Sequence, residues 1–189
     1  MNYSHVFWPF ALVFFLVACN SNTPTTPQDQ PPLVPQITIT ATEIRCQDLQ
    51  NPAYQRMLLQ AINEIRQHPQ QCGEQYFPAV APLKWNNQLY QTALSHAQEM
   101  AQHNFIGHVS ITGQDFRTRL KHSQFSGRGG GENVARGQKN LHAVMATWLA
   151  SPVHCHNLMH PKFTDYAIAC TTDQSTRQKN YWVQHFGVR

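Results

Sequence analysis

Residues 131–159 constrain the fold of this chain more than any other part of its sequence. Apolar side chains recur there at positions i, i+3, i+4, i+7 and i+8, the spacing of one helix face: Leu141, Val144, Met145, Trp148 and Leu149. Asn140 precedes them as a candidate N-cap. Ser151 and Pro152 predict that this helix stops and a second begins, because serine is a common N-cap and proline fits the first helical position. His154 then lies in the first turn of the second helix, a rigid position from which its side chain can point at a site.

Three residues in or near this stretch are candidates for chemistry: His108, Glu132 and His154. His108 lies in a predicted loop between two glycines, and Glu132 begins a strand predicted over residues 132–136, after a flexible glycine-rich approach at residues 127–131. Neutral imidazoles are good zinc ligands, and a nearby carboxylate can orient an imidazole or a bound water. The alternative interpretation is structural: Glu132 ties down a loop or caps a helix, and the two histidines are satisfied polar groups beneath it.

The rest of the chain has the pattern of helices followed by a β-hairpin. A helix is predicted after Asn51, a second after Asn86 and a short third around Phe116 and Leu120. Residues 166–172 and 181–188 are rich in β-formers and are separated by a polar turn. This order predicts an α+β domain in which helices cover an antiparallel sheet.

Four short segments carry a resemblance to a known family. They read Asn-Phe-Ile-Gly-His-Val-Ser at 104–110, Gly-Glu-Asn-Val-Ala at 131–135, Trp-Leu-Ala-Ser-Pro-Val-His at 148–154 and Tyr-Trp-Val-Gln at 181–184. In this order they resemble the CAP superfamily, the cysteine-rich secretory, antigen 5 and pathogenesis-related 1 proteins that share the SCP domain, and its bacterial branch in particular. The resemblance extends over residues 54–188. It implies a three-layer α-β-α sandwich with a central antiparallel sheet and a central cleft.

The resemblance also implies roles for the candidate residues. In the family, two histidines and a glutamate at the positions of His108, His154 and Glu132 line the cleft, and the histidines can bind a divalent metal, often zinc. The wider family has a second glutamate three residues after the tryptophan, where this chain has Ser151, as is common in the bacterial branch. Two protein ligands are fewer than the three typical of catalytic zinc, so any metal is expected to bind weakly.

The remaining histidines receive other interpretations. His156 and His160 are four residues apart and form a second, less favoured candidate metal pair, because Pro161 follows directly. His185 lies in a strand pattern and is predicted to be a packed core or surface residue. Four more are predicted to be solvated helix or loop residues: His96, His103, His122 and His142.

The N-terminal segment has the pattern of a targeting sequence. Residues 6–18 are almost wholly apolar but too few to span a bilayer comfortably, and Leu-Val-Ala-Cys at 16–19 resembles the bacterial lipobox. We therefore expect a lipoprotein signal peptide at 1–18, a lipidated Cys19 with a Pro/Thr/Gln-rich tether at 19–45, and the CAP-like domain at 46–189. An ordinary signal peptide or a short anchor is the alternative, because no basic residue precedes the apolar run and Pro9 interrupts it. In a Gram-negative source, Asn20 is typical of sorting to the outer membrane.

Cysteine usage also indicates export. Four cysteines remain after Cys19, and an even number in an exported domain predicts two disulfides. Four cysteines allow three pairings, and the sequence alone does not choose among them. We favour Cys72 with Cys155 and Cys46 with Cys170.

Two functions remain open. The first is a cell-envelope binding module that takes an apolar or carbohydrate-like molecule, or an envelope component, in its cleft. The second is a metal-dependent hydrolase in which His108 and His154 hold the metal and Glu132, the catalytic candidate, activates water. The missing second carboxylate and third ligand favour the first. The net charge of +4 is modest and no basic run occurs, so we expect no nucleic-acid partner.

The lipid anchor gives the first testable prediction. The Cys19→Ser variant should lose metabolic lipid labelling and remain unprocessed or soluble, because the cysteine sulfur is the attachment point. Mass spectrometry and membrane fractionation measure both effects. Unchanged mass and equal membrane retention of the variant would show that the segment anchors the chain in another way.

Overall fold

The computed structural model describes residues 44–174 and 179–189 of the 189-residue chain. The predicted signal peptide, Cys19 and residues 19–43 of the tether lie outside the described residues. No helix among the residues described has the length and apolar character needed to cross a membrane. The described elements belong to a compact unit that spans residues 32–189, and they are the following, in chain order: η1 (Cys46–Gln50), α1 (Pro52–Arg66), β1 (Gln70–Cys72), β2 (Gln75–Phe77), β3 (Lys84–Trp85), α2 (Asn87–His103), α3 (Phe116–His122), β4 (Gly129–Arg136), α4 (Leu141–Ala150), α5 (Pro152–Leu158), β5 (Asp165–Thr172) and β6 (Asn180–Val188).

A four-stranded sheet forms the middle layer of the domain. Its strand order is β3-β5-β6-β4, and β5, β6 and β4 pair antiparallel, which confirms the predicted hairpin. The two-residue strand β3 differs from the prediction, since it joins the edge parallel to β5. The long connection between β3 and β5, which contains several helices, permits this parallel pairing.

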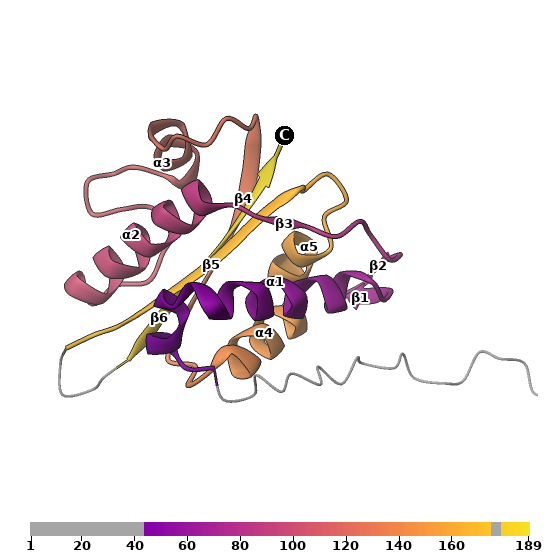
Figure 1. Ribbon diagram of the computed structural model, residues 1–189, viewed down its shortest axis with the longest axis horizontal. Helices are drawn as coiled ribbons and strands as arrows, with labels where there is room; N and C mark the ends of the chain where they lie inside the picture. The colour runs from indigo at the N-terminus through magenta and orange to yellow at the C-terminus, as the bar shows by residue number, and fades with distance from the viewer. Residues whose placement is uncertain (1–43, 175–178) are drawn as a thin grey trace, which may run out of the picture. The chain divides into compact units, whose positions relative to one another are not determined.

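Helices cover both faces of this sheet, so the predicted α-β-α sandwich is confirmed (Figure 1). One core lies between the sheet and α1, α4 and α5, and the second lies between the sheet and α2 and α3. Both cores and two disulfides lie within the compact unit, which therefore has the internal contacts of an independently folding domain.

Helix α2 shows how sequence pattern positions the site. Its four predicted inward residues are fully buried: Leu89, Ala93, Ala97 and Met100. The side chain of Asn86 caps the helix by accepting hydrogen bonds from the backbone N–H groups of Gln88 and Leu89. The helix ends at Asn104, whose φ of 50° is the left-handed conformation of a C-cap. The small alanines let α2 lie close to β5 and β6, and its end delivers the chain to the loop that carries His108.

Strand β4 begins earlier than the sequence predicts. Residues 129–131, expected to be a flexible approach, are paired with β6: Gly129 with Val188, Gly130 with Gly187 and Gly131 with Phe186. A Cβ atom at Gly130 would collide with the carbonyl oxygen of Phe186. Glycine is therefore needed here for close approach of two backbones rather than for flexibility.

The two disulfides join the favoured pairs of cysteines, Cys46–Cys170 and Cys72–Cys155. The first ties η1 to β5, and the second ties β1 to α5. Ile44 and Arg45, assigned to the tether by the sequence, belong to the folded unit, because Ile44 is buried and its carbonyl accepts a hydrogen bond from the backbone N–H of Leu141.

Candidate functional site

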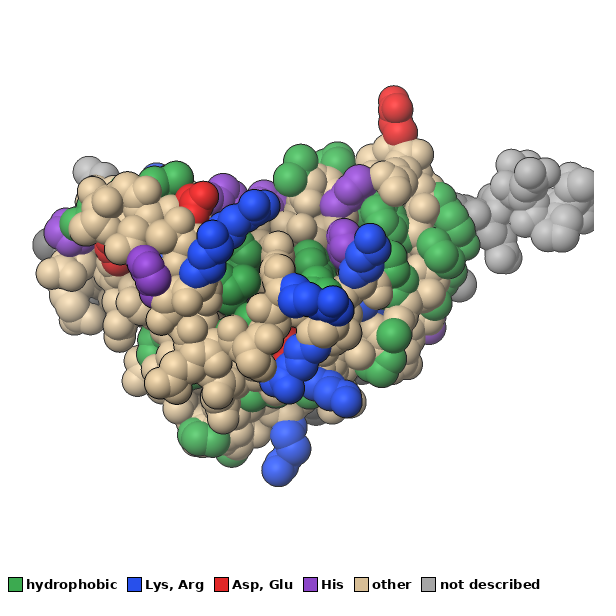
Figure 2. Space-filling model, turned by 90° about the horizontal axis from the view of Figure 1, so that it is seen from above, with side chains coloured by type: hydrophobic (Ala, Val, Ile, Leu, Met, Phe, Trp, Pro, Cys, Tyr) green, Lys and Arg blue, Asp and Glu red, His purple; other side chains and the backbone are tan. Residues whose placement is uncertain are grey.

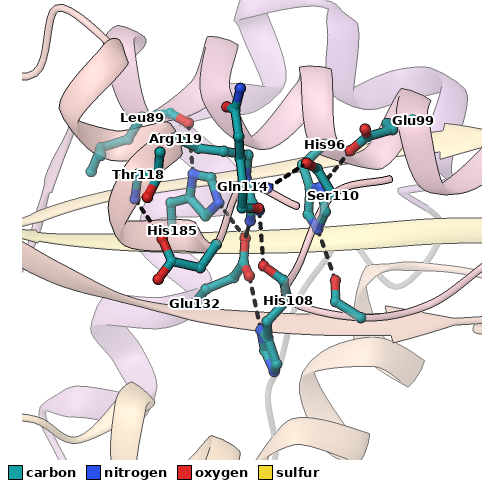
Figure 3. A network of polar contacts seen from close by, with 12 residues as sticks. Leu89, His96, Glu99, His108, Ser110, Gln114, Thr118, Arg119, Glu132 and His185 are labelled. Carbon is teal, nitrogen blue, oxygen red and sulfur yellow. Dashed lines mark hydrogen bonds and ion pairs between the residues drawn. The ribbon is translucent and has the colours of Figure 1, made fainter. Parts of the chain in front are cut away.

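The carboxylate of Glu132 lies at the centre of a polar network (Figure 3). Glu132 is on β4 directly opposite His185 on β6, and paired residues of neighbouring strands project from the same face of a sheet. His185 Nε2 donates a hydrogen bond to Glu132 Oε2 over 2.8 Å, and both side chains are buried. The Leu89 carbonyl oxygen of α2 lies 3.2 Å from the other ring nitrogen of His185.

Arg119, on α3, joins this network to the loop that precedes its helix. Its Nη2 donates to Glu132 Oε2 over 2.6 Å. Its Nη1 donates to two loop carbonyls, that of His108 over 2.8 Å and that of Gln114 over 2.9 Å. One guanidinium therefore ties the buried carboxylate, the loop and α3 together, a use for which its forked geometry is suited.

His108 completes the network at the surface. Its Nδ1 lies 2.8 Å from Glu132 Oε1, and because a carboxylate only accepts, the proton is on Nδ1. In the neutral ring, Nε2 then carries the free lone pair, and the side chain is 54% exposed. The carboxylate thus sets both the tautomer and the orientation of a half-exposed imidazole.

The charges of the network shift the pKa values of its members. Burial alone would raise the pKa of Glu132, but hydrogen bonds from His108 and His185 and the charge of Arg119 outweigh it and hold this pKa far below its usual range. The hydrogen bond to Glu132 raises the pKa of His108. Burial lowers the pKa of His185 although Glu132 opposes this shift. Glu132 is therefore ionised throughout the physiological pH range.

His154 lies in the first turn of α5, as predicted, with Pro152 at the first helical position. Ser151 occupies the N-cap position, but its side chain makes no capping hydrogen bond. Burial lowers the pKa of His154, and the nearby His108 lowers it further, so the two imidazoles act on each other electrostatically. In the described part of the chain, His154 Nδ1 is buried without a hydrogen-bond partner. An orphaned ring nitrogen of this kind is available to a ligand or a metal.

Asn133 fixes α5 against the sheet beside Glu132. Its Nδ2 donates to Gln184 Oε1 over 3.0 Å and to the backbone carbonyl of His154 over 3.2 Å. Its Oδ1 accepts from Asn157 Nδ2 over 2.8 Å. The residue beside the site glutamate therefore holds the helix that carries the second histidine.

The arrangement of potential metal ligands is sparse. Among the residues that the structure describes, no group of three or more His, Cys, Asp or Glu side chains is placed to hold a metal ion. The second candidate pair has other contacts: His156 packs edge-on against Phe77, and His160 stacks on Phe163 while its Nδ1 accepts from the backbone of Lys162. These contacts give His156 and His160 structural roles.

A groove of about 590 Å³ lies between α2 and the segment around α3, and Arg119 forms part of its wall. Its walls are carboxamides, hydroxyls and two basic side chains, with no carboxylate: Asn87, Gln88, Gln91, Thr92, Ser95, Gln114, Arg119, His122, Ser123 and Gln124. The volume is within the range of ~300–1,000 Å³ of small-molecule sites. The three predicted site residues are not in its lining, but Arg119 belongs to both the groove and the Glu132 network.

Sequence reasoning missed three members of this region: Arg119, His185 and His96. His96 was expected to be solvated, but it is 1% exposed, and its Nε2 lies 2.8 Å from the carbonyl oxygen of Gly107. It is three residues after Ala93 and four before Met100, so the helical period could have placed it at the buried face. His185 could have been found only with the strand register, and Arg119 had no sequence signal.

Replacing Glu132 tests the network. Glu132→Gln should lower the free energy of unfolding by about 3–5 kcal/mol, because it leaves the guanidinium of Arg119 buried without its charge partner. It should also lower the pKa of His108, because the contact that raises this pKa is lost. Urea denaturation and NMR titration of the histidine ring measure the two effects.

The raised pKa of His108 also determines how the free energy of unfolding depends on pH. A raised pKa at His108 stabilises the fold below the ordinary histidine value of about 6.5, and this contribution is lost as the pH rises through the raised value.

The control for Glu132→Gln is Glu99→Gln, which removes a carboxylate contact of His96 instead and should leave the His108 titration unchanged. An unaltered His108 pKa in Glu132→Gln would contradict the assigned contact.

Comparison with known proteins places this geometry in a family. The model of the cysteine-rich secretory protein family, CAP, matches residues 59–186. YkwD, an uncharacterised protein of Bacillus subtilis, is 27% identical over 134 residues, which cover 71% of this chain and 47% of YkwD, so this chain matches about half of that relative.

Two solved structures share the fold. An extracellular protein with an SCP domain from Bacillus anthracis has a TM-score of 0.58 and 21% identity, covering 85% of this chain and 45% of its own. An outer surface protein from Borrelia burgdorferi has a TM-score of 0.58 and 22% identity, covering 71% of this chain and 91% of its own. With the family model matching more than half of the residues, this chain belongs to the cysteine-rich secretory protein (CAP) family.

Proposed function

We propose that this chain is an exported, lipid-anchored binding module of the cell envelope rather than a hydrolase. The lipobox-like sequence at residues 16–19 and two disulfides support export. The similar folds of an extracellular protein and an outer surface protein support the same location. The family fold by itself does not decide the activity, so the choice between binding and catalysis rests on the site.

The state of Glu132 carries the proposal. A general base must be within hydrogen-bond reach of the proton it removes and needs a pKa near the working pH. Both carboxylate oxygens of Glu132 already accept hydrogen bonds, its side chain is 2% exposed, and its pKa is far below the usual range. Glu132 is therefore a positioning residue for His108, which disfavours the hydrolase in which it activates water.

The groove beside Arg119 favours a polar ligand over an apolar one. Carboxamides and hydroxyls form most of its lining, and these groups both donate to and accept from sugar hydroxyls. Four of the carboxamide side chains make no hydrogen bond to another described residue: Gln88, Gln91, Gln114 and Gln124. We therefore assign the groove to a carbohydrate-like ligand.

A saccharide titration tests this assignment. A neutral N-acetylhexosamine oligomer should bind the wild type, and Gln88→Ala/Gln91→Ala should weaken binding about tenfold, because two hydrogen bonds of about 0.5–1.5 kcal/mol each are lost. Gln98→Ala/Gln102→Ala is the matched control, since both lie on the same helix outside the groove. Equal loss in both double variants, measured by calorimetry, would place the saccharide elsewhere.

The histidine pair fits a weakly held divalent metal as a second ligand of the domain. His154 has an orphaned buried nitrogen, and His108 has a free Nε2 with a carboxylate on its other nitrogen, the usual arrangement of a metal-ligating histidine. His108 and His154 would hold the ion, and the ion would supply a Lewis-acid contact for a ligand oxygen. Two imidazoles do not make the three-ligand set of catalytic zinc.

Zinc titration separates this pair from the other histidines. Calorimetry should show one weak site that is lost in His108→Ala/His154→Ala and retained in His156→Ala/His160→Ala. Affinity should fall as the pH drops through the raised pKa of His108, because protons then compete for its ring nitrogen. Equal zinc uptake by the wild type and His108→Ala/His154→Ala would move the site away from this pair.

A further inference from the structure

At one end of the central sheet, a cation lies in or next to every strand. A single register row crosses all four strands there: Lys84 pairs with Asp165, Asp165 with Gly187, and Gly187 with Gly130. The cations lie at or just beyond this row, at positions scattered in the sequence: Lys84 in β3, Lys162 before β5, Arg189 after β6 and Arg128 before β4. Only the strand pairing brings these cations to one end of the sheet, so they form no basic run in the sequence.

Helix α3 extends this basic end beyond β4. Its first residue, Phe116, lies next to Gly130 of the same register row. Arg117 and Lys121 follow on α3, four residues apart and therefore on one helix face. Figure 2 looks down on the end of the molecule where the C-terminus lies in Figure 1, and it shows Lys and Arg side chains gathered across the middle of this face. We call these six residues the basic sheet end: Lys84, Arg117, Lys121, Arg128, Lys162 and Arg189.

Little negative charge opposes the basic sheet end. Asp165 is the carboxylate of the register row, and it is buried and hydrogen-bonded to Asn86 and Thr164. Its ion pair with Arg189, at 3.0 Å, uses one of the six cations. The other five are exposed and form no ion pair with any described residue; one of them, Arg117, interacts electrostatically with the exposed carboxylate of Asp115, the N-cap of α3. Their positive potential is therefore directed outward.

The arrangement of the six cations fits a negatively charged surface better than a single small anion. Four strands spaced ~4.8 Å apart make a row ~14 Å wide, and α3 widens it further. Six cations on five different backbone segments spread over this width do not converge on one point, as the donors of a phosphate or carboxylate pocket do. Separate contacts spread over a face match an array of anionic headgroups, to which each lysine or arginine contributes independently.

We propose that the basic sheet end docks the folded domain on an anionic lipid surface. The proposed lipid anchor would hold the domain near a membrane, and the basic sheet end would then decide which face it turns toward the lipid. A lipid chain and a basic patch are the usual two signals of stable membrane attachment. The docking does not require the anchor, because the unit at residues 32–189 contains all six cations and its own core.

Vesicle sedimentation of the unit at residues 32–189 tests the proposal without the anchor. It should bind vesicles of equal parts phosphatidylcholine and phosphatidylglycerol, not phosphatidylcholine alone, and release as salt rises. Each cation near an anionic membrane is worth about 1 kcal/mol, about fivefold in affinity, so Arg128→Gln/Lys162→Gln should bind about 25-fold more weakly. Arg128→Lys/Lys162→Arg keeps both charges and should bind like the wild type.

The control removes the same charge from the other end of the sheet. Lys139→Gln/Lys179→Gln changes an exposed residue beyond the end of β4 and a partly exposed one before the start of β6, and it should bind like the wild type. Equal losses in the two glutamine double variants would show attraction by net charge alone and overturn the proposal, as would binding to phosphatidylcholine vesicles. Soluble polyphosphate or DNA that binds more tightly than the vesicles, with the same dependence on Arg128 and Lys162, would also overturn it in favour of an anionic polymer.

Discussion

The rest of the site depends on one buried negative charge, the carboxylate of Glu132. Burying an ionised carboxylate costs several kcal/mol unless hydrogen bonds and opposite charge offset the lost hydration. Here the offset comes from three directions: His185 on the neighbouring strand, Arg119 on α3 and His108 on the loop. Each partner belongs to a different element, so the carboxylate can be buried only when sheet, helix and loop are all in place. The charge thereby links the formation of the site to the completion of the fold.

The contacts around Glu132 explain how the exposed His108 is held on a loop. The loop before and after His108 is fastened at three points: the Gly107 carbonyl contacts the buried His96, the His108 carbonyl accepts from Arg119, and the imidazole itself contacts Glu132. On the opposite side, Asn133 and the disulfide Cys72–Cys155 hold α5 and with it His154. Both histidines are therefore held by several contacts of the surrounding fold, which limits the entropy that the proposed ligand would have to remove.

The sequence predicted what is encoded locally and missed what only pairing creates. The caps predicted at Asn51 and Asn140 form, because a short side chain needs only the next two or three backbone N–H groups. His108, Glu132 and His154 were visible because the family segments contain them. By contrast, His185 reaches Glu132 through the β4–β6 register, and the basic sheet end assembles from five separate segments. Neither the His185–Glu132 contact nor the grouping of the cations can be predicted from positions along the chain, since both depend on which strands become neighbours.

Arg119 belongs to both the Glu132 network and the polar groove. Its guanidinium holds Glu132 and the His108 loop, while its side chain also forms part of the wall of the polar groove, and its buried Nε has no hydrogen-bond partner in the described ranges. If a ligand oxygen in the groove attracted Nε, the whole planar guanidinium would have to move. The same guanidinium donates to Glu132 and to the loop. Such movement would weaken one of the three hydrogen bonds that the buried carboxylate accepts, which opposes it. Arg119 thus joins the groove and the Glu132 network into one connected set of residues, so a change at either one acts on the other through a single side chain.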